Sequence, residues 1–383
     1  MKLKKWLPLL LIGLLAGCAA KKSAQPKPKP KPKAPVVLTT KQKINQQVAK
    51  MTLDEKIGQL FVTEVPNDSA QVKQDIQKYH LGGILLMGNN FVGNRDSFKN
   101  RLAGYQRVAK VPLMIATDQE GGTVSRLSNN PKISGRSSYP SPQESFNKGG
   151  MKAVLASYRG QARNLKSLGI NWNFAPVADV SKHPDSFIYN RTLGKGYVKT
   201  ARYISKVVPE IQAQGVAASV KHFPGYGAAA DTHTGSASVD RSLTEFKRSD
   251  FIPFRAGIRS GADSVMVTHI ILKKVDPRRP ASLSKKVIDV LRNDLNYDGV
   301  IVSDSLQMGA VSDYAAKYHV SRDVAAFKAG NDVLLSSDYQ IGIPKIKRAV
   351  EKHEISETQL NKSVARILMM KHKVGLSVVD KGK

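Results

Sequence analysis

The stretch GVAASVKHFPG, residues 215–225, combines a short apolar run with an abrupt polar end. Residues 215–220 have the length and apolar composition of a buried strand. Lys221 and His222 follow at once, and Pro224 and Gly225 then mark a turn. In barrels of parallel strands and helices, the loops after the strands build the active face. This stretch therefore predicts a strand that delivers a lysine and a histidine to such a face.

Seven more apolar runs of strand length are separated by segments with helical spacing. The eight runs are residues 59–65, 83–87, 113–117, 170–175, 215–220, 264–268, 299–303 and 332–336. The helical segments include residues 151–168, 197–214 and 243–259 and a final helix at 357–373. This alternation predicts an α/β fold, a single (β/α)8 TIM-type barrel that forms the catalytic domain at residues 42–378. An open doubly wound sheet stays possible, because counting strands does not show closure.

Charged residues and histidines follow six of these eight runs. In chain order they are Asp118, Asp179, Lys221 with His222, His269, Asp304 and Asp338. Ordinary turns after strands would favour Ser, Asn and Gly at these positions. The pattern therefore predicts an enzyme whose site lies at the carboxyl ends of the strands.

The residue types at these ends narrow the chemistry. The chain has no HExxH and no CxxC motif, which disfavours a metal hydrolase. Residue types that bind metals are nevertheless present at Asp118, His222, His233, His269 and Asp304. The sequence lacks a G-x-S-x-G nucleophile elbow and a G-x-G-x-x-G dinucleotide turn, and we expect no cofactor. A Schiff-base role for Lys221 is neither supported nor excluded by its neighbours.

Glycoside hydrolysis requires an acid/base and a carboxylate that face an oxocarbenium-like centre. Asp304 suits the carboxylate, because it follows a β-branched run and has small serines on both sides. A histidine held by an aspartate can donate and accept a proton near neutral pH. Asp231 and His233 are two residues apart, so both side chains can face the same way in an extended loop. The glycines before this pair indicate a mobile loop that carries it.

The charge of the chain indicates an anionic environment. The 383 residues hold 60 Lys and Arg against 30 Asp and Glu, a formal charge of +30 at pH 7. Without zinc-finger spacing or a basic-aromatic ribonucleoprotein motif, we expect no nucleic-acid partner. Anionic cell-wall polymers explain the positive charge as well as nucleic acid would. Lys347, Arg348 and Lys371 are interpreted as a solvated face, and we expect a monomer.

The N-terminus predicts attachment to a membrane. Residues 1–17 form a basic segment and a short apolar run, typical of a signal peptide and too short for a membrane span. The small residues before Cys18, the only cysteine, resemble a bacterial lipobox, which implies that Cys18 carries lipid. An ordinary signal peptide is the alternative. Residues 18–41, with PKPKPKPK at 26–33, predict an extended stalk. The expected location is the extracellular face of the cell membrane, lipid-anchored.

Eight ordered blocks of sequence carry a resemblance to a known family. They are MTLDEKIGQL (51–60), GGILLMG (82–88), TDQEGGTVSRL (117–127), NFAPVADV (173–180), NRTLG (190–194), KHFPGYG (221–227), DTH (231–233) and IVSDSLQMGA (301–310). In this order the chain resembles glycoside hydrolase family 3, specifically its NagZ-type β-N-acetylglucosaminidases, over nearly everything after the stalk. The resemblance implies exo-acting, retaining hydrolysis of terminal β-linked N-acetylglucosamine, and we expect the substrate to be peptidoglycan or other cell-wall fragments.

The resemblance also implies a role for each matching residue. Asp304 would be the nucleophile that forms a glycosyl-enzyme, His233 the acid/base, and Asp231 its partner. The residues that would bind the sugar are Asp118, Arg126, Arg191, Lys221, His222 and His269.

Two departures from the family pattern fall in the catalytic loop. Tyr226 replaces a histidine, and three residues separate Gly227 from Asp231 where four are common. Because Asp231 and His233 are retained, we interpret the chain as an active subgroup variant. The alternatives are a β-glucosidase or β-xylosidase, a glycoside phosphorylase, and a non-catalytic glycan-binding lipoprotein.

Overall fold

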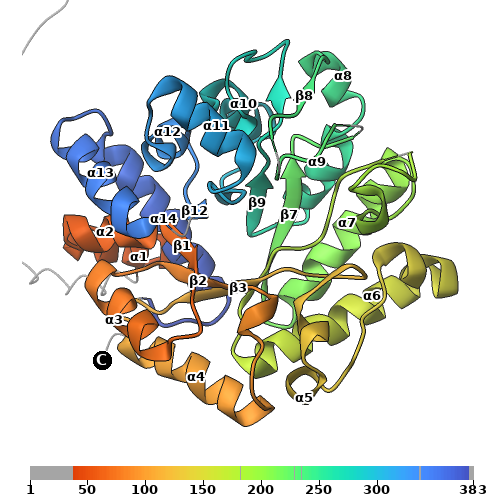
Figure 1. Ribbon diagram of the computed structural model, residues 1–383, viewed down its shortest axis with the longest axis horizontal. Helices are drawn as coiled ribbons and strands as arrows, with labels where there is room; N and C mark the ends of the chain where they lie inside the picture. Colours follow the sequence, from red (N-terminus) through yellow and green to blue (C-terminus); the bar gives the residue numbers. More distant parts are fainter. Residues whose placement is uncertain (1–37, 182, 228, 234, 336–337, 379–383) are drawn as a thin grey trace, which may run out of the picture. The chain divides into compact units, whose positions relative to one another are not determined.

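The computed structural model describes residues 38–181, 183–227, 229–233, 235–335 and 338–378. Helices surround a sheet of short parallel strands (Figure 1). The strands of this sheet are β1 (Phe61–Glu64), β2 (Gly83–Leu86), β3 (Met114–Thr117), β6 (Trp172–Asn173), β7 (Ala217–Phe223), β9 (Ser264–Val267), β11 (Val300–Ser303) and β12 (Leu334–Leu335). Each overlaps one of the predicted runs. The signal peptide, Cys18 and the stalk up to residue 37 lie outside the described residues.

The sheet closes on itself. Its strand order is β11-β9-β7-β6-β3-β2-β1-β12, and neighbouring strands are parallel. The two ends meet through a parallel bridge between Val302 and Val333, where the Ser303 amide donates to the Val333 carbonyl at 3.0 Å. The Leu335 amide donates to Ser303 Oγ at 3.1 Å across the same seam. The predicted (β/α)8 barrel is therefore confirmed, and the open sheet is excluded.

The outer layer consists of helices that precede, connect and follow the strands (Figure 1). Its main helices are α1 (Thr40–Lys50), α2 (Leu53–Gln59), α3 (Ser69–Tyr79), α4 (Arg95–Val108), α6 (Pro142–Leu168), α7 (Tyr197–Gln212), α9 (Phe251–Arg259), α10 (Lys285–Asp289), α11 (Gly309–Tyr318), α12 (Arg322–Ala329), α13 (Tyr339–Glu351) and α14 (Glu357–Lys373). Among the described helices, none has both the length and the apolar character needed to cross a membrane.

Capping residues in the sequence determine where several helices begin. At α2, the Thr52 side chain accepts from the Glu55 amide at 3.2 Å, while the Glu55 carboxylate accepts from the Thr52 amide at 2.9 Å. Ser141 and Glu144 form the same reciprocal pair at the start of α6. These bonds satisfy amides that have no partner within the first helical turn.

Two predicted helices differ from those observed. Helix α6 begins nine residues before the predicted start at 151, with a break in helical geometry at Gly149 and Gly150. The predicted helix at 243–259 is two helices, α8 (Leu243–Lys247) and α9. Between them Asp250 turns inward and is bound by Arg241 at 2.8 Å. The side-chain period does not reveal this break, because the ion pair depends on a residue that precedes the helix.

The interpretation of Lys371 as a solvated residue is wrong. Its side chain is fully buried on α14 and donates to Gln59 Oε1 at 2.6 Å. Burial lowers the pKa of Lys371 to about 7, because the charged ammonium loses its hydration. Arg348, by contrast, is exposed on α13, and Lys347 on the same helix pairs with Asp54 at 2.8 Å.

Candidate active site

Several of the predicted site residues lie at the carboxyl ends of the strands, whereas Arg126, Arg191, Asp231 and His233 lie in the segments that follow. Asp118 directly follows β3, and Asp304 directly follows β11. Lys221 and His222 belong to the end of β7 itself, which extends three residues beyond its predicted limit to Phe223. The parallel barrel therefore brings together side chains that are far apart in the sequence.

A buried network of charges connects β3 to β7. Lys221 Nζ lies 2.6 Å from Asp118 Oδ1 and 2.6 Å from Glu120 Oε1. The Arg191 guanidinium binds Glu120 through two bonds, from Nε at 2.9 Å and from Nη2 at 2.8 Å. Arg126 Nη2 lies 4.0 Å from Asp118 Oδ2, on the outer side of the network. Two carboxylates and three cations thus share one small volume.

Glu120 is the site residue that the sequence analysis missed. Its side chain is fully buried, and burial alone would raise its pKa. The charges and hydrogen bonds of Arg191 and Lys221 outweigh that effect and hold the pKa of Glu120 at about 2. A local signal was present, because Glu120 lies two residues after Asp118 at the end of a strand. Residues at this spacing point to the same side of an extended chain.

His222 is held in one tautomer by its neighbours. Its Nδ1–H donates to Asp179 Oδ2 at 2.7 Å, and its backbone amide donates to the same oxygen at 3.1 Å. Arg191 Nη2 lies 3.1 Å from His222 Nε2, which must accept because a guanidinium only donates. His222 therefore links Asp179 to the Arg191–Glu120 pair and orients the guanidinium.

Asp231 and His233 form the predicted pair. His233 Nδ1 lies 2.5 Å from Asp231 Oδ1, and the His233 amide donates to the same oxygen at 3.0 Å. Partial burial raises the pKa of Asp231, but the bonds from His233 outweigh it and lower the pKa below its usual value. The His233 side chain is 57% exposed, so its Nε2 edge is accessible to a substrate.

Asp304 is held in a tight turn after β11. Its amide donates to the Val267 carbonyl at 2.9 Å, and Oδ1 accepts from the Ser305 amide at 2.8 Å. Burial by itself would raise the pKa of Asp304, but its polar surroundings, which include the Ser305 amide and the Lys221 ammonium, lower it below its usual value. The carboxylate is therefore ionised and available as a nucleophile.

His269 lies near Asp304, two residues after the end of β9, and is completely buried. Its Nε2 lies 2.9 Å from the Ser305 carbonyl, which can only accept, so Nε2 carries the proton. Its Nδ1 then accepts from the Ser282 hydroxyl at 2.7 Å. Burial lowers the pKa of His269, which agrees with a neutral ring. Both ring nitrogens are thus used within the protein, and a sugar contact through them stays a prediction.

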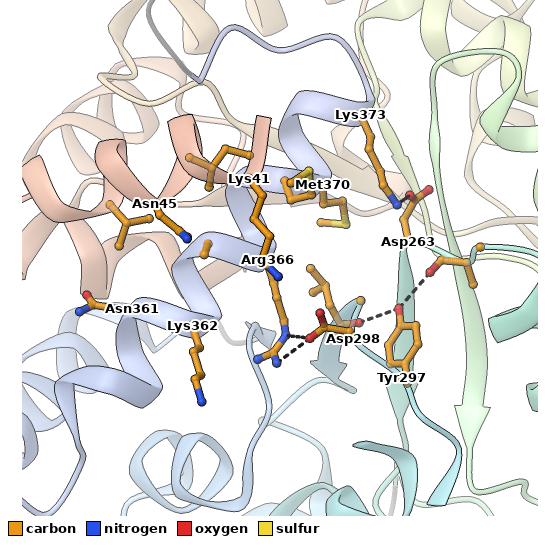
Figure 2. Close-up of a pocket in the computed structure, with 18 of the residues that line it drawn as sticks. Lys41, Asn45, Asp263, Tyr297, Asp298, Asn361, Lys362, Arg366, Met370 and Lys373 are labelled. Atoms are coloured by element: carbon orange, nitrogen blue, oxygen red, sulfur yellow. Dashed lines mark hydrogen bonds and ion pairs between the residues drawn. The ribbon is translucent and has the colours of Figure 1, made fainter. Parts of the chain in front are cut away.

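A large cavity lies at the other end of the barrel and contains none of these residues. It has a volume of about 880 Å³ and lies beside α1, α14 and the segments that precede β9 and β11 (Figure 2). Two of its cations are paired, Arg366 with Asp298 at 2.8 Å and Lys373 with Asp263 at 3.4 Å. Within the described ranges, no group of three or more His, Cys, Asp or Glu residues is placed to hold a metal ion. The strand ends remain the candidate active site.

Comparison with known families agrees with this geometry. The model of the glycosyl hydrolase family 3 N-terminal domain matches residues 52–370. The chain belongs to glycosyl hydrolase family 3. This family 3 chain is 30% identical over 330 residues to Beta-hexosaminidase LpqI of Mycobacterium tuberculosis, covering 83% of this chain and 82% of that protein. It is 30% identical over 387 residues to Beta-hexosaminidase A of Pseudoalteromonas piscicida, covering 89% of this chain and 62% of that protein.

A solved structure gives the same picture. A family 3 β-N-acetylglucosaminidase from Paenibacillus superposes with a TM-score of 0.78 at 32% identity. The match covers 87% of this chain and 64% of the Paenibacillus chain, so this protein spans less than two thirds of that enzyme. The resemblance seen in the sequence blocks is therefore confirmed as family 3 membership, and the chain is a glycoside hydrolase.

Proposed function

We propose that the protein is an exo-acting, retaining β-N-acetylglucosaminidase that removes terminal β-linked N-acetylglucosamine. One observation carries the proposal: an ionised Asp304 lies at the same barrel end as the exposed Asp231–His233 pair. Backbone bonds tie the two together, because the amide of Gly309, five residues after Asp304, donates to the His233 carbonyl at 3.1 Å. The choice of sugar is supported by relatives named β-hexosaminidases and β-N-acetylglucosaminidase.

In the first step, Asp304 attacks the anomeric carbon as the bond to the leaving oxygen breaks. His233 donates its Nε2 proton to that oxygen, so the leaving group departs as a neutral alcohol. Asp231 accepts a hydrogen bond from His233 Nδ1–H, which keeps its proton throughout and leaves Nε2 to face the substrate. The product of this step is a glycosyl ester of Asp304 with inverted configuration at the anomeric carbon.

In the second step, His233 acts as a base. It takes a proton from water, the water oxygen attacks the anomeric carbon, and the bond to Asp304 breaks. Asp304 leaves as a carboxylate, and His233 is protonated again for the next cycle. Two inversions give net retention of configuration.

The charge network is suited to binding the hydroxyl groups of the sugar. Asp118 is held by Lys221 and retains a second oxygen on the outer side. Arg126 Nε is buried and has no hydrogen-bond partner within the described residues. The Arg126 side chain as a whole is 27% exposed beside Asp118, so a sugar hydroxyl between the two would bond both charged groups, and bonds of this kind are strong.

Turnover of nitrophenyl glycosides tests this function. The full chain is expected to release nitrophenol from the β-N-acetylglucosaminide and not from the β-glucoside or β-xyloside. Asp304→Asn should abolish release, and unchanged release without phosphate excludes phosphorolysis. Saturable binding of N-acetylglucosamine oligomers without any turnover would instead support a glycan-binding protein and overturn the proposal.

We also propose that the protein works at the cell surface, held by a lipid on Cys18, on cell-wall fragments. The sequence before residue 42 supports the anchor. A basic groove of about 720 Å³ between α10, α12 and α13 supports contact with anionic wall polymers. Its cations are Arg279, Lys285, Lys286, Lys328, Lys345, Arg348 and Lys352, against two acids, Asp276 and Glu354.

A further inference from the structure

Tyr226 and Thr232 form a buried hydrogen bond beneath the catalytic loop. Their hydroxyl oxygens are 2.6 Å apart, and the two residues are 2% and 0% exposed. A hydroxyl pair shielded from water in this way is worth more than an exposed one, because neither group has water as an alternative partner. Thr232 lies between Asp231 and His233, so the bond acts at the centre of the acid/base segment.

The three residues of this segment alternate in direction. The side chains of Asp231 and His233 are 38% and 57% exposed, whereas Thr232 is completely buried. The chain bends at Thr232 and His233, and both the amide and Nδ1 of His233 bond to Asp231 Oδ1, so these two exposed side chains stay together while Thr232 faces the interior. An inward Thr232 therefore accompanies an outward Asp231 and His233. The bond to Tyr226 is what holds the Thr232 side chain on the inner side.

Tyr226 is itself held on three sides. Its amide donates to Asp179 Oδ1 at 2.8 Å, the same carboxylate that binds His222. Its ring packs edge to face against His222 at 5.2 Å and against Phe187 at 4.9 Å between centroids. Tyr226 therefore connects the rigid end of β7 with the loop that carries His233.

The start of α11 supplies the other anchor of the loop. The amides of Gly309 and Ala310 donate to the carbonyls of His233 and Thr232, at 3.1 and 3.4 Å. These backbone bonds fix the position of the segment relative to the start of α11. They do not fix which side chains face outward, because a backbone carbonyl can accept in either case.

We propose that Tyr226 is a positioning residue for the acid/base, acting through Thr232 to hold His233 toward the glycosidic oxygen. This inference rests on the proposed function of His233. Loss of the Tyr226 hydroxyl should leave the fold and the nucleophile intact. It should weaken proton donation, because acid catalysis depends on a donor held within hydrogen-bond distance of the leaving oxygen.

The test compares two N-acetylglucosaminides that differ in their need for an acid. A dinitrophenyl leaving group departs without a proton, whereas a methylumbelliferyl leaving group benefits from one. We expect Tyr226→Phe and Thr232→Val each to lower kcat/KM about 10- to 30-fold for the second substrate and less than about threefold for the first. The double variant should be no worse than either single variant, since both remove one bond.

Tyr203→Phe is the matched control. Tyr203 and Tyr158 form another buried hydroxyl pair, 2.7 Å apart, between α7 and α6. This variant should leave the ratio of the two substrates unchanged. Equal losses on both substrates in Tyr226→Phe and Thr232→Val, or no loss in either, would overturn the proposal.

Hydrogen exchange separates this inference from the proposed function. The amides of residues 229–233 should exchange faster in Tyr226→Phe and Thr232→Val than in the parent or in Tyr203→Phe. If the parent protein turns over no glycoside, the proposed function fails. The exchange rates still show whether the Tyr226–Thr232 hydrogen bond holds the segment. Unchanged exchange in both variants would mean that the Tyr226–Thr232 hydrogen bond does not hold the segment, whatever the activity.

Discussion

Lys221 and Glu120 form an ion pair of 2.6 Å in which neither side chain is more than 2% exposed. The two residues come from different strand ends, and Arg191 completes the charge balance with two bonds to the same carboxylate. Such a pair is tolerated inside a protein only when its hydrogen bonds replace lost hydration. Here the pair also places Lys221 against Asp118, so one buried glutamate organises two residues predicted to bind the sugar.

Glu120→Gln tests this organising role. The amide keeps the shape of the side chain but leaves Lys221 and Arg191 with less negative charge. We expect a loss of about 3–5 kcal/mol in the free energy of unfolding, measured by denaturant titration. We also expect kcat/KM to fall by roughly 100-fold or more, because Arg191 and Lys221 lose their fixed positions.

Glu210→Gln is the control for that variant. Glu210 pairs with Arg159 at 2.6 Å near the surface, and the arginine is 44% exposed. Its loss should change the free energy of unfolding by less than about 1 kcal/mol. Equal destabilisation by the two substitutions would mean that the buried network has no special role.

If Asp304 is the nucleophile, as proposed, its pKa should determine the acid side of the activity profile. Because this pKa lies below the usual value of 3.8, Asp304 stays ionised at lower pH than a free aspartate. With a dinitrophenyl substrate, which needs no acid, kcat/KM should be flat from neutral pH to about pH 5. Lys221→Met removes one neighbouring cation and should move the acid limb to higher pH. An acid limb with its midpoint near pH 6 in the parent protein would contradict this assignment.

Lys371 should make stability depend on pH above neutrality. Its pKa is about 7 in the folded protein against 10.5 for an exposed lysine. Between these values the unfolded chain binds more protons than the folded one, so the free energy of unfolding rises with pH. We expect a contribution of up to about 1.4 kcal/mol per pH unit between pH 7 and 9.

Lys371→Met should remove that contribution, and exposed Lys362 on the same helix offers Lys362→Met as a control. Denaturant unfolding of the full chain at a series of pH values measures the slope. A slope that persists unchanged in Lys371→Met assigns the pH dependence to other groups.

Cys18 is the one residue in the chain to which a thioether-linked lipid can be attached. Growth of a bacterial host with an alkyne-tagged fatty acid should label the parent chain and leave Cys18→Ala unlabelled. Ser23→Ala, a nearby stalk substitution, should be labelled like the parent. Equal labelling of Cys18→Ala would exclude lipid attachment at this site.

The basic groove should bind a phosphate-bearing wall polymer in a salt-dependent way. Lys345→Gln with Arg348→Gln removes two exposed cations of the groove. The affinity for poly(glycerol phosphate) should fall about 5- to 10-fold at low salt. Lys199→Gln with Lys206→Gln removes the same charge from α7 and serves as the control. Equal losses in the two double variants would mean that net charge alone drives binding.

Local patterns in the sequence were sufficient to predict the strands, the final helix and several site residues. All eight predicted runs contain strands, because a strand buried on both faces must be apolar along its length. The final helix was predicted with its observed bounds. Asp118, Lys221, His222 and Asp304 were placed at strand ends, since the end of an apolar run is visible in the sequence itself.

Tertiary structure decided what depends on distant partners. Closure of the barrel rests on the contact of Val302 with Val333, and strand pairing leaves no local periodicity. Burial of Glu120 and Lys371 was not readable, because a charged residue looks the same in the sequence whether solvent or a partner surrounds it. In the sequence, Tyr226 is only a departure from the family motif. Its hydrogen bond to Thr232 depends on the conformation of the loop between them, which the sequence does not show. Sequence alone determined which reactive residue types stand at the strand ends. The fold determined which of these side chains contact one another, because such contacts follow from packing between elements.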